Sequence, residues 1–485
     1  MKAFVCVWAA VSLTLQVSPA FAQSINTEPN HNPERRGIRL LDDEHIRRLS
    51  TRRSHGKAIP IDERKSIFVT DVEILKVFTF DELMDRLVED SGSHTLTRDI
   101  LFQQWWDTAN PKATFNLPFG GPNCDSGLLN TFPYACPRDE GQQVTEDPFG
   151  GVVSTAYTAI ALSNRFDLAT SPDDGGTDCG EYRIVFERNT GAANPLDRNL
   201  IIFEAVLPNP HPRPHSLGGC RPVQEFWEGL SAPGLSLATR AKRLHDFYYH
   251  GLPKEKVEAV VRAKHYGAAS TQAAGQVRTN QFMAPPAGVT QHGPWLLRQF
   301  HIETSSGSMK FVPVAVANNP LGTLLDETIN QPLGTSFRTD FLSQIASLSN
   351  PNIDLLAMST ASKYDAGESQ ESGTTPMDYK AAFANSPNFR AAIQAKIPAG
   401  SGLTPDDIVN RAQTQTCAGC HHLSVNVAIG GSLTWPATLP PTFTHEQLAS
   451  PDTTPPEGPR YQISDALKNV FLPFRKQVIE AFLGP

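Results

Sequence analysis

Hydrophobic residues recur at two different periods along the chain. A capping-box pattern at residues 79–82, followed by apolar residues at helical spacing from Phe80 to Leu87, predicts a helix over residues 79–89. Residues 181–188 alternate apolar and charged side chains and residues 199–207 are almost wholly apolar, which predicts a half-buried strand and a central one. The same criteria predict strands over residues 276–283, 295–303 and 310–316, and helices over residues 96–107, 237–250, 254–266, 336–348, 378–396 and 464–483, with another helix opening at Thr404.

These elements come in runs of strands and runs of helices. Such an order favours an α+β fold over a doubly wound one, with a large mixed domain and a mainly antiparallel sheet over residues 66–358. Residues 359–376 are rich in Ser, Thr, Gly and acidic residues, so we predict a linker there. Residues 377–485 are then expected to form a small all-α domain.

The first 65 residues differ from the rest of the chain in their composition. A short basic start, an apolar run and an Ala-x-Ala sequence predict a signal peptide over residues 1–22, cut after Ala22. Residues 23–65 are predicted to be a basic, flexible lead-in, because residues 34–65 carry ten Lys or Arg among six carboxylates. A docking arm is the alternative interpretation of this segment.

Charge and hydropathy indicate which kinds of partner and which cellular location the protein can have. The formal net charge is −8, with acidic and basic residues interspersed, so no chain-wide positive field would attract nucleic acid. No stretch after the signal peptide reaches eighteen apolar residues, so we expect no membrane span. Together with the signal peptide, this predicts a periplasmic or secreted protein.

Six cysteines remain once Cys6 leaves with the signal peptide. An even number in an oxidising compartment favours structural disulfides. If the pair near residue 420 serves a cofactor, the other four allow three connectivities. The more local one is favoured, which joins Cys124 to Cys136 and Cys179 to Cys220.

The most specific motif lies late in the chain, where Cys417-Ala418-Gly419-Cys420-His421 matches Cys-x-x-Cys-His. Two thiols at this spacing can add to the two vinyl groups of one haem, and the adjacent histidine can bind its iron as an axial ligand. The tail from about residue 378 to residue 485 thereby resembles c-type cytochromes, and the resemblance implies one covalently attached haem c. A local disulfide or thiol redox pair, and a zinc site, are the alternatives.

The sixth iron ligand is open at the level of sequence. No methionine follows Met377, so the common downstream methionine is missing. His445 is the candidate we favour among protein ligands, because His422 is adjacent to His421 and cannot easily reach the opposite face of a haem. Met358, Met377 or an open position are the other interpretations.

The resemblance supplies no reaction, and catalytic residues are unknown. We expect an exported haem c protein that transfers electrons in the periplasm, or a redox enzyme whose N-terminal domain binds a substrate or partner. If it is an enzyme, it is an oxidoreductase. Its partner would be a redox protein or a small-molecule substrate. The alternative is a secreted or surface binding protein whose haem is structural or sensory.

Overall fold

The fold is taken from a computed structural model that describes residues 58–106, 128–134, 143–151, 153–267, 275–283, 294–305, 307–329, 331–371, 376–440 and 444–484. The predicted signal peptide, most of the predicted lead-in, and Cys124 and Cys136 lie outside these ranges. Residues 58–65, at the end of the predicted lead-in, lie against the rest of the protein. There Ile61 is buried and the Ile59 backbone N–H donates to Glu228 at 3.2 Å.

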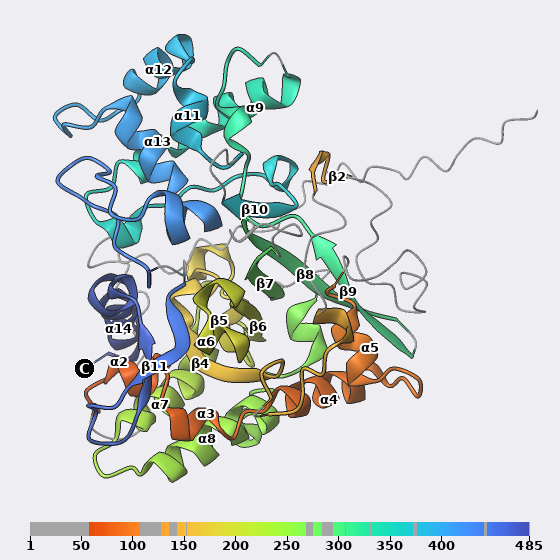
Figure 1. The fold of residues 1–485 in the computed structure, drawn as a ribbon. Helices are drawn as coiled ribbons and strands as arrows, with labels where there is room; N and C mark the ends of the chain where they lie inside the picture. The colour runs from red at the N-terminus through yellow and green to blue at the C-terminus, as the bar shows by residue number, and fades with distance from the viewer. Residues whose placement is uncertain are drawn as a thin grey trace, which may run out of the picture. The chain divides into compact units, whose positions relative to one another are not determined.

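An eight-stranded sheet forms the centre of the fold, in the order β1-β4-β5-β6-β7-β8-β10, with β9 also paired to β8 (Figure 1). Every described strand pair is antiparallel, which confirms the mixed fold with a large antiparallel sheet. The strands are β1 (Phe68–Val69), β4 (Tyr157–Arg165), β5 (Asp178–Arg188), β6 (Asn199–Pro208), β7 (Gln276–Phe282), β8 (Trp295–Ser305), β9 (Ser308–Val314) and β10 (Glu368–Glu371), besides two small pairs, β2 (Leu128–Leu129) with β3 (Phe132–Pro133) and β11 (Glu446–Asp452) with β12 (Arg460–Ile463).

The predicted helix starts are largely confirmed. The Thr79 side chain accepts from the Glu82 backbone N–H and begins α4, and α8 has the predicted bounds. No helix in the described ranges is long and apolar enough to cross a bilayer. The helices are α2 (Glu63–Ser66), α3 (Val72–Leu75), α4 (Phe80–Ser91), α5 (Arg98–Gln103), α6 (Thr190–Ala193), α7 (Arg221–Glu228), α8 (Leu237–His250), α9 (Pro332–Phe341), α10 (Ile345–Leu348), α11 (Tyr379–Phe383), α12 (Pro387–Gln394), α13 (Pro405–Gln413) and α14 (Leu472–Leu483).

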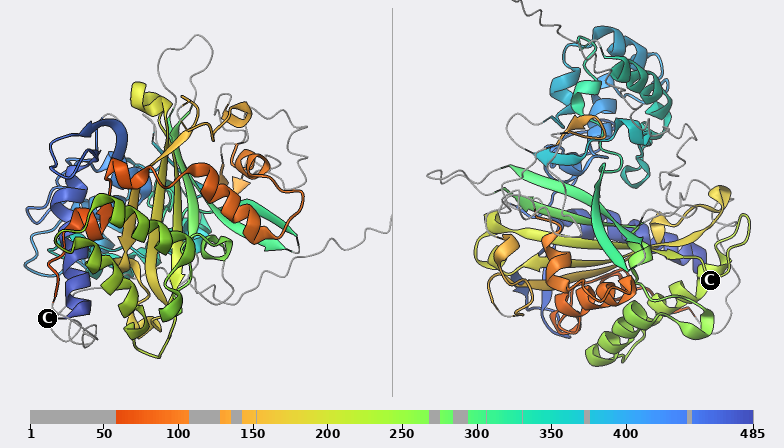
Figure 2. Two further views of the ribbon diagram at one scale, coloured as in Figure 1. Left: turned by 90° about the horizontal axis from the view of Figure 1, so that it is seen from below. Right: turned by 90° about the vertical axis from the view of Figure 1, so that its right-hand side faces the viewer.

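Two large apolar cores organise these elements. The first lies between the sheet and the helices α4, α5, α7 and α8, and both views of Figure 2 show α4 and α8 along one face of the sheet. Trp105 and Trp106 are fully buried in this core. The second core joins the helices α9 to α13 to Trp295 and Leu297 of β8. Strand β8 therefore contributes to both cores.

The division of the chain differs from the predicted one in two places. Residues 368–371 of the predicted linker form β10, which pairs with β8 and so belongs to the sheet. After α13 the chain continues through β11 and β12 to α14, and Val478, Ile479 and Phe482 of α14 lie in the first core. The described tail thus contains strands and shares the core of the large sheet, so it is not a separate all-α unit.

Two helix predictions are corrected by local backbone geometry. Residues 254–266 do not form one helix, because Lys256 has a left-handed φ of 59° and Leu252 pairs with Val257 as a β-bridge. Residues 378–396 divide into α11 and α12, which begins at Pro387, and a proline lacks the N–H that a helix interior needs. The last predicted helix is confirmed, because residues 465–483 are helical throughout, with a π-helical turn over Leu467–Phe471 before α14.

Candidate functional site

The Cys-x-x-Cys-His motif lies on a tight turn that follows α13. The helix opens at Thr404, as predicted, and Thr404 and Asp407 cap it reciprocally. The motif continues into a π-helical turn over Gly419–Leu423. Gly419 is required by the packing, because a Cβ atom there would lie 1.8 Å from the carbonyl oxygen of Gln413. The turn therefore holds both cysteines and His421 within a few residues of a fixed helix end.

Hydrogen bonds from distant segments fix this turn. The Ala418 backbone N–H donates to the Ser369 hydroxyl of β10 at 3.0 Å. The Trp435 indole N–H donates to the Cys420 carbonyl at 3.2 Å, and the Thr438 hydroxyl donates to the His421 carbonyl at 3.1 Å. The motif is thus attached to the edge of the large sheet as well as to its own loop.

The two motif cysteines are free thiols and are half-buried. Burial raises the pKa of Cys417, and burial followed by the neighbouring Cys417 raises the pKa of Cys420 to about 12. A redox-active cysteine pair normally needs a thiol of lowered pKa, since the thiolate is the nucleophile. Cys179 and Cys220, by contrast, form a disulfide, which confirms one of the two predicted bridges.

A second histidine faces the motif. The ring of His445 lies 4.9 Å from that of His421, between centroids, and its Nε2 lies 3.8 Å from the Cys420 sulfur. On its other side, His445 Nδ1 shares a 2.9 Å hydrogen bond with the Ser464 hydroxyl. Trp295 of β8 stacks on the His421 ring at 5.6 Å.

The orientation of His445 suits metal binding. A histidine that binds a metal through one ring nitrogen commonly has the other nitrogen fixed by a hydrogen bond, which sets the ring orientation. Burial, and then His421 and Arg475, lower the pKa of His445 well below its ordinary value, so its ring is neutral. The Nε2 of this neutral ring therefore faces the motif and could offer its electron pair to a metal.

The remaining candidate ligands lie elsewhere. The Nδ1 of His422 lies 3.0 Å from a carboxylate oxygen of Glu371 in β10. Met358 and Met377 are both buried in the second core. Of the candidates weighed for the sixth position, His445 is the one whose ring lies against His421.

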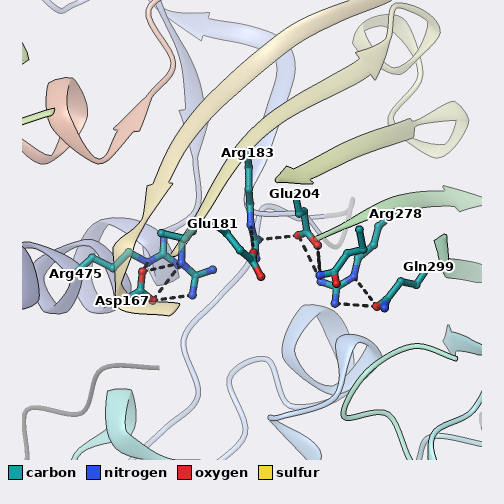
Figure 3. Close-up of polar contacts among 9 residues, drawn as sticks. Asp167, Glu181, Arg183, Glu204, Arg278, Gln299 and Arg475 are labelled. Atoms are coloured by element: carbon teal, nitrogen blue, oxygen red, sulfur yellow. Dashed lines mark hydrogen bonds and ion pairs between the residues drawn. The ribbon is translucent and has the colours of Figure 1, made fainter. Parts of the chain in front are cut away.

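Charged and amide side chains form a row across strands β4 to β8, which we call the polar row. Figure 3 shows Arg475 beside Asp167 at one end and Gln299 at the other. Arg183 forms ion pairs with Glu181 at 2.6 Å and with Glu204 at 3.0 Å. Burial by itself would lower the pKa of Arg183, but these two carboxylates raise it above its ordinary value. The polar row consists of Arg165, Asp167, Glu181, Arg183, Glu204, Arg278, Gln299 and Arg475.

The tail covers this polar side of the sheet. The Leu448 backbone N–H donates to Glu187 at 2.7 Å, and Arg198, which pairs with Glu187 at 2.8 Å, also donates to Thr444 at 2.9 Å. The interpretation of residues 181–188 as half-buried is therefore wrong. Both faces of this strand are buried, because its charged residues are neutralised by partners and covered by the tail.

The donor set fits a covalently bound haem. Two unpaired thiols, an adjacent histidine and a second imidazole whose Nε2 faces them are the groups that attachment and two axial bonds require. An iron atom between the two rings would require them to move apart. No group of three or more His, Cys, Asp or Glu side chains in the described ranges is placed to hold a metal ion.

Comparisons with known proteins add no further information, since no family model, curated protein or solved structure matches the chain. Sequence reasoning found Cys417, Cys420, His421 and His445. It missed Trp295, on a predicted strand, Ser369, on the predicted linker, and the polar row, whose residues come from predicted strands, from around the end of the unpredicted β4 and from α14. No local signal marks these residues, because their role depends on contacts with residues far away in the chain.

Proposed function

We propose that this chain is an exported electron-transfer protein that carries one haem c attached at Cys417 and Cys420. The observation that carries the proposal is the pairing of the motif with a second imidazole, His445, whose ring lies 4.9 Å from that of His421. The haem, when bound, supplies an iron centre that gains and loses one electron. The chain would function by holding this centre in a fixed environment.

Each residue of the site has a defined part in the proposal. Cys417 and Cys420 would hold the haem through thioether bonds. His421 and His445 would be the residues that bind its iron. Ser464 orients His445, and Trp295 stacks on His421. If both histidines bind the iron, little room would remain for a small ligand, which would suit electron transfer better than catalysis on the iron.

Two features support an exported protein. The first 22 residues have the pattern of a signal peptide. The disulfide between Cys179 and Cys220 is typical of an oxidising compartment. We therefore propose a periplasmic or secreted location, with a redox protein or a small molecule as the partner that exchanges electrons.

The proposal is tested by expressing the full chain in cells that mature c-type cytochromes. Wild type should keep its haem through denaturing electrophoresis, because thioether bonds survive unfolding, and Cys417→Ala with Cys420→Ala should lose it. His421→Ala should lose the low-spin absorption spectrum, whereas the matched variant His422→Ala should keep it. Wild type without covalent haem would overturn the proposal, and a high-spin wild type that binds cyanide rapidly would favour a redox enzyme over electron transfer.

A further inference from the structure

An open groove of about 640 Å³ lies between α3 and α8, which lie side by side in Figure 1. Its floor is apolar and is made by Val77, two residues after α3, and by Leu237, Ala238 and Ala241 of α8. Val77 is 39% exposed and is one of three large hydrophobic side chains that are exposed within the described ranges. The groove therefore leaves apolar surface uncovered by the described part of the chain.

The ionisable residues that line the groove already have partners within the chain. Their contacts are 2.5 to 3.0 Å long and join Glu73 to Lys76, Lys242 to Asp246, and His245 to Glu82. Paired charges at a solvent-exposed rim contribute little to binding, because they gain little by exchanging one partner for another. What the groove offers to a ligand is therefore its apolar floor.

The first described residues of the chain lie close to this groove. The Asp62 backbone N–H donates to the Ser231 hydroxyl at 2.9 Å, and Ser231 lies six positions before α8 begins. Lys65 pairs with Glu457 at 2.6 Å, and Glu457 also pairs with Arg240 of α8. Six residues span at most about 20 Å, so Asp62 lies within that distance of the start of α8, where the groove begins.

Residues 38–49, which lie outside the described ranges, carry apolar side chains at helical spacing. Four of them stand at positions i, i+3, i+8 and i+11, which share one face of a helix: Ile38, Leu41, Ile46 and Leu49. Most of the other residues in this segment are charged. Leu49 precedes Asp62 by thirteen positions, an extended length of roughly 40 Å, so the segment can reach the groove.

We propose that residues 38–49 form an amphipathic helix that docks in this groove of the same chain, with its apolar face on Val77, Ala238 and Ala241. A short helix is marginal in water and gains its stability by burying such a face. The two alanines let a second helix approach α8 closely. Because the segment is tethered nearby, its effective concentration is high and a weak contact suffices. The lead-in is then a docking arm, and this role is independent of the proposed function.

The test follows trypsin cleavage of the full chain after Arg47 and Arg48, with the cut sites identified by intact mass. A protease cuts the open form of a segment, so the cleavage rate reports the fraction of chains in which the segment is undocked. Ala238→Arg places a long cation on the exposed part of the apolar floor and should speed this cleavage roughly tenfold. The double variant Ile38→Ser, Leu41→Ser should have a similar effect, because it removes the apolar face from the segment.

Two matched controls separate docking from general effects of the substitutions. Ala391→Arg makes the same change at an exposed alanine of α12, which does not line the groove. Leu40→Ser removes a leucine that lies on the other face of the expected helix. Both variants should be cleaved at the wild-type rate. Val77→Asp repeats the test from the other wall of the groove, in case Ala238→Arg lowers the melting temperature by disturbing α8.

Equal cleavage rates in wild type, the groove variants and the double variant would overturn the inference. A wild-type dimer in light scattering that Ala238→Arg dissociates, without faster cleavage, would overturn it as well, because a second copy would then occupy the groove. Faster cleavage in the groove variants alone would also contradict it, since the apolar face of the segment would then make no contact. None of these outcomes depends on attached haem, so failure of the proposed function leaves the test intact.

Discussion

Replacing Gly419 with alanine tests whether the motif turn is held by the end of α13. The added methyl carbon would lie 1.8 Å from the Gln413 carbonyl oxygen and 2.7 Å from the Thr416 hydroxyl, whereas carbon atoms rarely approach within 3.0 Å. The turn and the helix end must therefore separate by about 1 Å. That movement strains the hydrogen bonds from the Thr416 backbone N–H and hydroxyl to the Gln413 carbonyl, at 3.0 Å and 2.9 Å.

The expected cost follows from these contacts. Overpacking of a buried site costs about 1–3 kcal/mol, and a weakened buried hydrogen bond adds about 1 kcal/mol. For a folded chain of this length, the melting temperature should fall by roughly 2–4 °C. Since the thiols and His421 lie on the displaced turn, the fraction of chains carrying covalent haem should fall as well.

The assay pairs thermal unfolding with haem quantification per chain, in Gly419→Ala and in a matched control. Gly229→Ala is suitable, because Gly229 has helical angles, φ −61° and ψ −16°, and its added methyl would meet only the movable end of Arg243 at 3.2 Å. If Gly419→Ala matches this control in melting temperature and haem content, the packing argument is refuted. A fall in melting temperature without haem loss would confine the effect to stability.

Three further outcomes are expected. His445→Ala should convert a low-spin ferric signal in electron paramagnetic resonance to a high-spin one, and His422→Ala should not; an unchanged spectrum in His445→Ala would remove it from the iron. Burial raises the pKa of Asp365 to about 7, so the folded state holds a proton that the unfolded state releases, and stability should fall by up to about 4 kcal/mol as pH rises from about 4 to about 7. Urea unfolding at pH 5 and pH 8 checks this, and Asp365→Asn should flatten the slope. Removing the bridge with Cys179→Ala and Cys220→Ala should cost about 4 kcal/mol by the loop-entropy model, measured by urea unfolding, and unaltered stability would contradict it.

Local patterns predicted most of the regular elements. The capping residues of α4 and α13 and the apolar runs of β6 and β8 are properties of short windows, so the sequence alone located them. Strand β4 escaped prediction although residues 157–165 are mostly buried in the fold. The bridge between Cys179 and Cys220 was predictable because the two residues are near in the chain.

The burial of the polar face of the sheet could not be predicted from the sequence. Alternating charges in residues 181–188 are typical of a strand with one face in water. Here Arg183 pairs with Glu204, and Glu187 pairs with Arg198 and accepts a hydrogen bond from the Leu448 backbone N–H of the tail. A burial pattern of this kind arises from residues more than 200 positions apart, and no window of sequence contains both sides of it. The same holds for the contact of Ser369 with Ala418.

The packing of α14 also determines when the first core can form during synthesis of the chain. The Leu483 carbonyl accepts a hydrogen bond from Arg221, 262 positions earlier, and Phe482 lies against Phe166 with ring centroids 4.6 Å apart. A chain synthesised from its N-terminus therefore cannot complete the first core until residues 472–483 have been made. The motif turn with Cys417 and Cys420 is therefore synthesised before this last helix can dock.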